Sequence, residues 1–141
     1  MLNGFVVLSL LAAAGQSGAV SDQSTYTPEQ LAVGAVREII SAQAVRRQSS
    51  PEEGYACSLE PLVEADLLAD VWLAGKRLEG YAFELWCDTR DAPQTTFRAS
   101  AVPMEKEKGS ELTVCADETN VPRTIEGSVA ECFEKGAPPG R

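Results

Sequence analysis

The sequence predicts an α+β fold in which an N-terminal helix covers one face of an antiparallel sheet. Two changes of pattern along the chain predict it. Apolar residues recur at helical spacing before residue 49, and from Gly80 onward they alternate with polar residues with a period of two. The alternating segments are short and have polar connections of hairpin length, which favours a meander of three or four strands. An amphipathic helix beside such a sheet buries its apolar stripe against it.

The first helix is expected over residues 28–48. Thr27 can cap its N-terminus, Pro28 suits the first helical position, and Gln30 completes a capping box. The predicted buried stripe is made of small and branched residues, namely Leu31, Ala32, Ala35, Ile39 and Ala42, flanked by Val36 and Ile40. Because several of these side chains are small, we expect the helix to lie very close to the sheet.

A loop over residues 54–59 follows and contains Cys57. Pro61 is expected to open a second, shorter helix that ends at Gly75. Its apolar positions are Leu62, Leu67, Leu68, Val71 and Trp72. Its acidic residues fall mostly in the first turns, where they complement the helix dipole and need no functional explanation.

Strand patterns begin after Gly80 and cover residues 81–87, 97–101, 112–116 and 121–125. The last segment carries Pro122 and is therefore predicted to be an edge strand. Residues 25–126 form the predicted globular domain. Residues 127–141 are expected to be a C-terminal tail that a disulfide through Cys132 tethers, with a frayed Gly- and Pro-rich end.

The composition excludes several classes of function. The chain has 141 residues, a formal net charge of −9 and no histidine. Such acidity argues against nucleic acid and against anionic membrane surfaces, because both partners attract a basic patch. Without histidine, histidine-based catalytic triads, zinc sites and general bases are excluded. No other pattern places a nucleophile beside a base, so the sequence predicts that the protein is not an enzyme.

The N-terminus is interpreted as a signal peptide over residues 1–19. The first 21 residues carry no charged side chain, the segment from Phe5 to Ala14 is apolar, and small residues follow it. A bilayer-spanning helix needs about 20 apolar residues, so we expect no stable membrane span. The protein is therefore predicted to be exported, to the periplasm or the extracellular space.

Four cysteines, Cys57, Cys87, Cys115 and Cys132, fit an exported protein with two disulfides. They allow three connectivities. The pairs Cys57–Cys87 and Cys115–Cys132 are favoured because they close the shortest loops. No Cys-x-x-Cys pair is present, which makes a zinc ribbon or a thioredoxin-type redox site a poor match.

Local motifs along the chain add a family resemblance through their order. The motifs are Ala35-Val36-Arg37-Glu38-Ile39-Ile40-Ser41-Ala42-Gln43, Gly54-Tyr55-Ala56-Cys57-Ser58-Leu59, Gly80-Tyr81-Ala82-Phe83, Phe97-Arg98-Ala99-Ser100-Ala101-Val102-Pro103 and Cys115-Ala116-Asp117-Glu118-Thr119-Asn120-Val121-Pro122-Arg123. In this order they resemble the globular part of type IV pilin-like and type II secretion pseudopilin-like proteins. The resemblance covers residues 27–123. It implies a pilin-like fold, with the first helix packed on the sheet.

The N-terminal pilin signature is degenerate in this chain. Gly4-Phe5 resembles a relic of the pilin cleavage junction, so the alternative for residues 1–19 is a degenerate pilin leader. Ser9 stands where the family places a glutamate. The apolar run stops at Ala14, and residues 15–24 interrupt the helix. The resemblance therefore implies the pilin head more firmly than a filament subunit. It implies a non-enzymatic protein that binds other proteins, as an accessory or minor component of a pilus or secretion pseudopilus or as a soluble relative.

The expected site residues are of two kinds. Interface candidates are Leu31, Ala35 and Ile39 on the first helix and Trp86 and Arg98 on the outer face of the sheet. The alternative for Trp86 is that the second helix or the tail covers it. Asp117, Glu118 and Asn120 form the tightest cluster of oxygen ligands and are candidate metal ligands, whereas the alternative is a solvated turn. The final turn of the family sometimes binds calcium, but Asn120 stands where a glycine is expected in that turn. No other cofactor is expected.

Two other functions remain open. A secreted small-ligand or inhibitor-like binding domain would have a concave apolar pocket near Trp86 or Tyr55. A carboxylate hydrolase would depend on Asp117 and Glu118 as its candidate residues.

Overall fold

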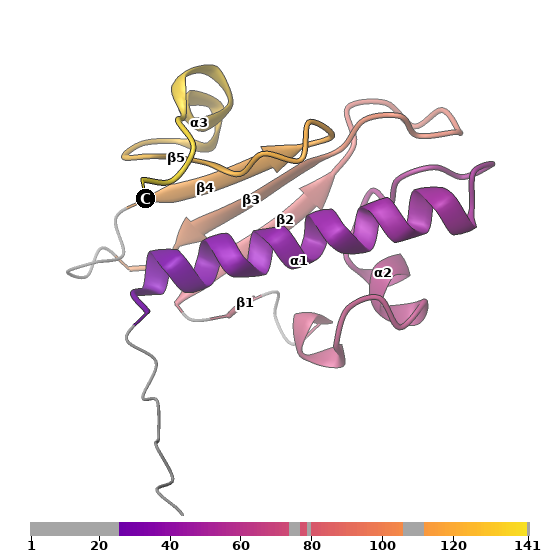
Figure 1. Cartoon of the computed structure of the whole chain (residues 1–141), viewed down its shortest axis with the longest axis horizontal. Coiled ribbons are helices and arrows are strands. Elements are labelled where there is room, and N and C mark those ends of the chain that lie inside the picture. The colour runs from indigo at the N-terminus through magenta and orange to yellow at the C-terminus, as the bar shows by residue number, and fades with distance from the viewer. Residues whose placement is uncertain (1–25, 74–76, 79, 106–111, 141) are drawn as a thin grey trace, which may run out of the picture.

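The computed structural model describes residues 26–73, 77–78, 80–105 and 112–140 (Figure 1). The elements are α1 (Pro28–Ser49), α2 (Glu60–Glu64), the 3-10 helix η1 (Asp70–Leu73), β1 (Arg77–Leu78), β2 (Tyr81–Trp86), β3 (Arg98–Pro103), β4 (Thr113–Asp117), β5 (Arg123–Ile125) and α3 (Val129–Lys135). This confirms the α+β class and the long first helix. The proposed signal peptide and the pilin-like junction lie outside the described residues.

Helix α1 begins as the sequence predicts. The Thr27 hydroxyl accepts the backbone N–H of Gln30, and the Gln30 side chain accepts the backbone N–H of Thr27. The buried stripe is rotated slightly from the predicted one and consists of Ala32, Val33, Val36, Ile39, Ile40, Ala42 and Gln43. Leu31 and Ala35 are only partly buried, because they lie at the edge of this stripe.

The prediction of one helix from Pro61 to Gly75 is wrong. The chain leaves the helical conformation at Asp66, which has a φ of 56°, and the N–H groups of Leu67 and Leu68 both bond back to the carbonyl of Leu62. Aspartate tolerates this left-handed conformation better than most residues. The turn places Leu68 in the core, and the chain resumes a helical conformation only in η1.

The strands form one antiparallel meander in the order β1-β2-β3-β4-β5. The period-two alternation predicts the inward residues of β2 correctly, since Tyr81, Phe83 and Leu85 are buried. Strand β5 lies at one edge, as Pro122 indicates. Strand β1, which pairs only with Tyr81 and Ala82, was not predicted because a two-residue strand leaves no periodicity to detect.

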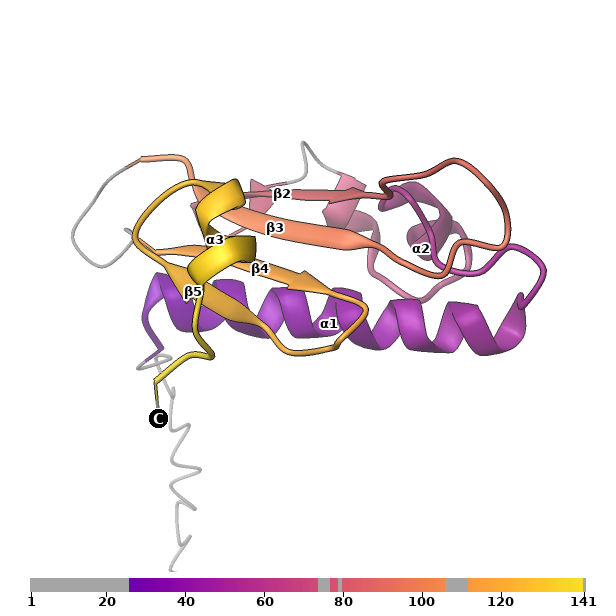
Figure 2. The same cartoon turned by 90° about the horizontal axis from the view of Figure 1, so that it is seen from above.

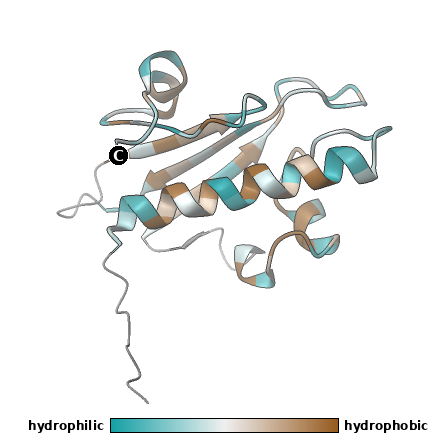
Figure 3. Ribbon diagram, in the orientation of Figure 1, coloured by the Kyte–Doolittle hydropathy of each residue, from teal (hydrophilic) through white to brown (hydrophobic). Residues whose placement is uncertain are grey.

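The sheet lies between two helices of very different length (Figures 1 and 2). Helix α1 packs on β3 and β4 from one side, and α3 packs on β4 and β5 from the other. The hydropathy colouring in Figure 3 places brown strands behind an α1 whose outward face carries both teal and brown residues. The core therefore forms between α1 and the sheet, with the second layer added outside it.

The predicted tail is a folded element. Ser128 and Glu131 form a second capping box at the start of α3. Beyond α3, Ala137 exchanges two backbone hydrogen bonds with Thr124. The expectation of a tail that only Cys132 holds was incomplete, because the motif Ser128-x-x-Glu131 already predicts a helix start.

Both predicted disulfides, Cys57–Cys87 and Cys115–Cys132, are present. Two disulfides in a chain of this size indicate an oxidising compartment and hence export. Of the helices in the described part of the chain, none combines the length and hydropathy needed to cross a bilayer.

Candidate protein-interaction site

The outer face of the sheet carries a cluster of aromatic and charged side chains, which we call the Phe133 cluster. It consists of Trp86, Arg98, Asp117, Arg123 and Phe133. The strand register creates it, because Trp86 of β2 lies opposite Arg98 of β3, and Arg98 lies opposite Asp117 of β4. These three residues form one row across the sheet. Phe133 reaches this row from α3.

The ring of Phe133 is in contact with two guanidinium groups and one indole. The Cζ atoms of Arg98 and Arg123 lie 4.8 and 5.7 Å from its centroid. Trp86 meets it edge to face, with the centroids 6.0 Å apart. Cation–π contacts of this kind stabilise by about 0.5–1 kcal/mol each at exposed sites. The tail thus covers Trp86 in part, as one of the two alternatives for this residue proposed.

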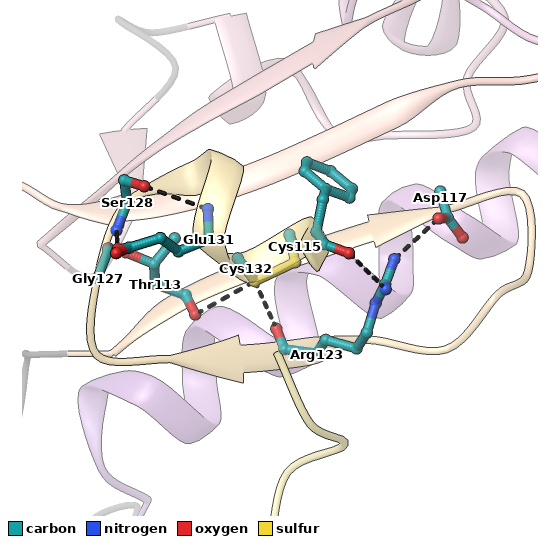
Figure 4. The surroundings of a disulfide bond; sticks show 9 residues. Thr113, Cys115, Asp117, Arg123, Gly127, Ser128, Glu131 and Cys132 are labelled. Atoms are coloured by element: carbon teal, nitrogen blue, oxygen red, sulfur yellow. Dashed lines mark hydrogen bonds and ion pairs between the residues drawn. A yellow bond between two sulfur atoms is a disulfide. The ribbon is translucent and has the colours of Figure 1, made fainter. Parts of the chain in front are cut away.

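Both arginines take part in ion pairs, and Arg123 is the more firmly held of the two. Arg123 donates hydrogen bonds to Asp117 Oδ2 at 2.9 Å and to the carbonyl of Phe133 at 3.0 Å (Figure 4). Arg98 lies 3.3 Å from Asp88, and their side chains are 44% and 52% exposed. The cluster is therefore anchored at Arg123 and open to solvent at Arg98. Partly exposed arginine and aromatic side chains are the groups that protein interfaces favour.

A buried disulfide supports the cluster from below. Cys115 and Cys132 are both fully buried and join β4 to α3. Beside them, the hydroxyl of Thr113 donates to the carbonyl of Gly127 at 2.7 Å (Figure 4). At the start of α3, hydrogen bonds from the backbone and side chain of Ser128 lower the pKa of the Glu131 carboxyl. The disulfide and the Thr113 hydrogen bond hold α3 and its preceding loop on β4, and the capping box stabilises the first turn of α3.

The geometry of the proposed calcium turn favours the alternative of a solvated turn. Asp117 Oδ1 accepts hydrogen bonds from the backbone and hydroxyl of Thr119, while its other oxygen accepts from Arg123. Asn120 adopts the left-handed conformation, with a φ of 64°. Within the described ranges, no three side chains of Cys, Asp or Glu converge on a point that a metal ion can occupy.

The candidates on α1 differ in exposure. Leu31 and Ala35 are partly exposed and line a hollow that also contains Trp72 and Phe83. Ile39 is fully buried and belongs to the core, so a partner does not reach it in this state.

Sequence reasoning missed a buried amide, Gln43. Its side chain donates to the carbonyl of Ala56 and accepts the N–H of Ala56, each at 2.8 Å, and it has no exposed surface. These bonds fix the loop to α1. The signal in the sequence was a glutamine on the apolar side of a helix, which a buried polar partner explains.

The same loop is held from its other side. Gly54 has a φ of 76°, and a Cβ atom there would overlap the backbone of Gln94. Tyr55 packs edge to face on Phe97 and accepts a hydrogen bond from Arg47. The loop between α1 and α2 is therefore a rigid part of the fold.

A buried phenol at the start of β2 is also structural. Tyr81 donates a hydrogen bond to the carbonyl of Leu112 at 2.9 Å. Burial, with a smaller effect of Glu29, raises the pKa of Tyr81 to about 12.

Comparison with family models, with curated proteins and with solved structures gives no significant match. The function is therefore inferred from the geometry of the chain itself.

Proposed function

We propose that this chain is an exported, non-enzymatic, pilin-like domain that acts by binding other proteins. It serves as an accessory or minor component of a pilus or secretion pseudopilus, or as a soluble relative of one. The observation that carries the proposal is the 22-residue helix α1 laid along an antiparallel meander. The sequence motifs that resemble pilins predict this arrangement. The two disulfides support export.

The Phe133 cluster is the contact surface that the proposal favours. Arg98 and Trp86 are partly exposed, and the hydrogen bond from Arg123 to the carbonyl of Phe133 holds Phe133 beside them. A side chain held in place loses little conformational entropy when a partner binds.

Mass analysis of the mature N-terminus tests the export and pilin aspects. Protein recovered from cells that make it naturally is expected to be processed. Cleavage after Gly4 with a methylated Phe5 supports a pilin, and cleavage after Ala14 or Ala19 supports a soluble exported relative. An unprocessed protein with four free thiols contradicts the proposal.

Crosslinking tests the protein contacts. A photoreactive amino acid at position 98 is expected to capture a partner in the same cells, whereas one at exposed Gln48, far along α1, serves as the matched control. Equal capture at both positions, or capture at neither, contradicts a contact surface at the Phe133 cluster.

A secreted small-ligand or inhibitor-like binding domain remains the second candidate. A hollow of about 450 Å³ between α1 and the side chains of Trp72 and Phe83 favours it. This hollow is not lined by Trp86 or Tyr55, near which the sequence placed the expected pocket. Saturable binding of a small apolar ligand that quenches Trp72 fluorescence would favour this candidate.

A further inference from the structure

A groove runs along the outward side of α1. One wall consists of Gly34, Arg37, Glu38, Ser41, Ala42 and Val45, and the other is the segment 66–70 between α2 and η1. Its volume is about 770 Å³. The hollow beside Trp72 continues it toward the start of α1, because the two share Gly34, Arg37 and Glu38. We call this continuous depression the α1 groove.

The α1 groove has the length and the apolar surface of a docking site for a helix. Two exposed apolar side chains mark its ends, Tyr26 at 65% exposure and Val45 at 48%. Tyr26 lies just before α1, and the helix from Pro28 to Val45 covers about 26 Å. Partly exposed apolar side chains lie between them, namely Leu31 and Ala35 on α1 and Leu67 on the other wall. Ala42 and Leu68 also line the groove, but their side chains are buried in the core. Amphipathic helices bind in grooves of this kind.

Gly34 stands where the two parts of the groove meet. Glycine inside a helix destabilises the helix relative to alanine. The fold does not require it, because a Cβ atom at this position would have no neighbour within 4 Å. Its absence leaves the wall of the groove flat at its midpoint. A glycine of this kind lets the backbone of another element approach closely.

The charges of the groove indicate the chemistry of the occupant. The lining side chains carry three carboxylates, on Glu38, Asp66 and Asp70, and one guanidinium, on Arg37. An excess of carboxylates attracts a basic partner and repels an acidic one. A second copy of this chain is disfavoured, since each copy has a net charge of −9.

We propose that the α1 groove binds a basic amphipathic helix of another protein. The apolar side of that helix lies on Leu31, Ala35 and Leu67, its backbone passes close to Gly34, and its lysines or arginines face Asp66 and Asp70. The inference rests on the proposed function, because it assumes that the chain acts through protein contacts, and it names the chemistry of one partner.

Titration with a synthetic helix tests the proposal. The probe is a fluorescein-labelled 18-residue peptide with leucines along one side and lysines along the other, and its matched control has glutamate at every lysine position. The lysine peptide is expected to raise the anisotropy saturably, and the glutamate peptide is not. Asp66→Lys with Asp70→Lys is expected to weaken binding at least tenfold, and 0.5 M salt is expected to weaken binding to the unmodified chain.

Variants of the groove wall distinguish binding in the groove from non-specific binding of the peptide elsewhere on the surface. Gly34→Leu fills the groove and is expected to weaken binding at least tenfold, whereas Ala44→Leu, which adds the same side chain at an exposed position of α1 outside the groove, leaves affinity unchanged. Gly34→Ala is expected to raise the melting temperature by about 3 °C, because it improves helix propensity without a clash.

Four outcomes overturn the proposal: no binding of the lysine peptide, equal binding of both peptides, unchanged affinity of Gly34→Leu, or a dimer of this chain that Gly34→Leu dissociates. If position 98 captures a partner and one of these four outcomes is found, the proposed function stands and the groove proposal is rejected. If the lysine peptide binds the groove but no partner is captured in cells, the groove proposal stands and the proposed contact surface is rejected.

Discussion

The two faces of the sheet are covered by helices that stay in place for different reasons. Helix α1 is long and buries seven residues against the sheet and the loop that follows α1, with Val36 and Ile39 fully enclosed. Helix α3 has seven residues, and Cys132 is the buried one among them. A disulfide and the hydrogen bond from Arg123 to Phe133 hold α3 on the sheet, and a capping box stabilises its first turn. One layer is thus held by apolar area, and the other by directed and covalent bonds.

This difference follows from element length. A helix of seven residues has about two turns and too little apolar surface to remain docked by burial alone. The Cys115–Cys132 disulfide keeps α3 docked where its buried apolar area is too small to do so. We therefore expect the α3 layer to loosen without the α1 layer, in the manner of a local unfolding unit.

The largest expected effect is on the α1 face. Ile39→Ala removes a fully buried side chain and is expected to lower the free energy of unfolding by about 4 kcal/mol, since a cavity remains. Urea denaturation followed by circular dichroism measures it. Val45→Ala, at an exposed position of the same helix, should change the value by less than about 0.5 kcal/mol. A similar loss in both variants would contradict the description of α1.

Removing the Cys115–Cys132 disulfide tests directly whether the α1 and α3 layers are held in different ways. Cys115→Ala with Cys132→Ala is expected to lower the free energy of unfolding by about 3 kcal/mol, because the bond restricts the unfolded chain by closing a loop between residues 17 positions apart. Hydrogen exchange should show lost protection in α3 and retained protection in α1. Cys57→Ala with Cys87→Ala is the control, and it should leave α3 protected. Loss of protection in both layers at once would show that the two faces unfold as one unit.

The buried amide of α1 gives a smaller expected effect. Gln43→Met preserves volume but leaves the N–H and carbonyl of Ala56 without their partner, which is expected to cost about 2 kcal/mol. The exposed change Gln48→Met controls for the substitution itself. An unchanged urea midpoint would mean that the loop finds other partners at no cost.

The smallest effect is a pH dependence on the α3 face. Hydrogen bonds from Ser128 lower the pKa of Glu131, so its contribution to stability is present above its ordinary value of 4.5 and is lost as pH falls through the folded value. Glu131→Gln keeps a capping side chain and removes the titration. Urea midpoints between pH 5 and pH 3 should therefore fall less in the variant. Glu134→Gln, on the same helix but outside the capping box, should keep the acid dependence of the original chain.

Local rules predict the elements that local rules determine. The capping box at Thr27, the edge position of Pro122 and the pairing of cysteines through the shortest loops are all confirmed. The prediction of the second helix was wrong beyond Asp66. This residue adopts a left-handed conformation and ends the helix, although the composition of the following residues favours a longer helix. Helix α3 was missed although its capping box is present, since its short apolar pattern lies beside glycine and proline.

The site was predictable only in part, because it depends on contacts distant in sequence. Strand alternation places Trp86 and Arg98 on one face, but only the strand register adds Asp117 to their row, and only α3 adds Phe133. Gln43 was not recognised because its partner is a backbone group 13 positions away. Sequence patterns specify the face on which a residue lies, whereas its partners depend on the whole fold.

The position of the two disulfides has a consequence for oxidation during export. Cys87 packs against the core on the α1 side, whereas Cys115 alternates with Val114 and Ala116 and lies on the α3 side. Once β2 and β4 are joined through β3, the sheet keeps these two thiols on opposite sides. Cys87 can then react only with Cys57, and Cys115 only with Cys132, so the folded sheet prevents non-native pairing. We expect an oxidant alone to complete both bonds after the sheet has formed, with a disulfide isomerase needed only for chains oxidised earlier.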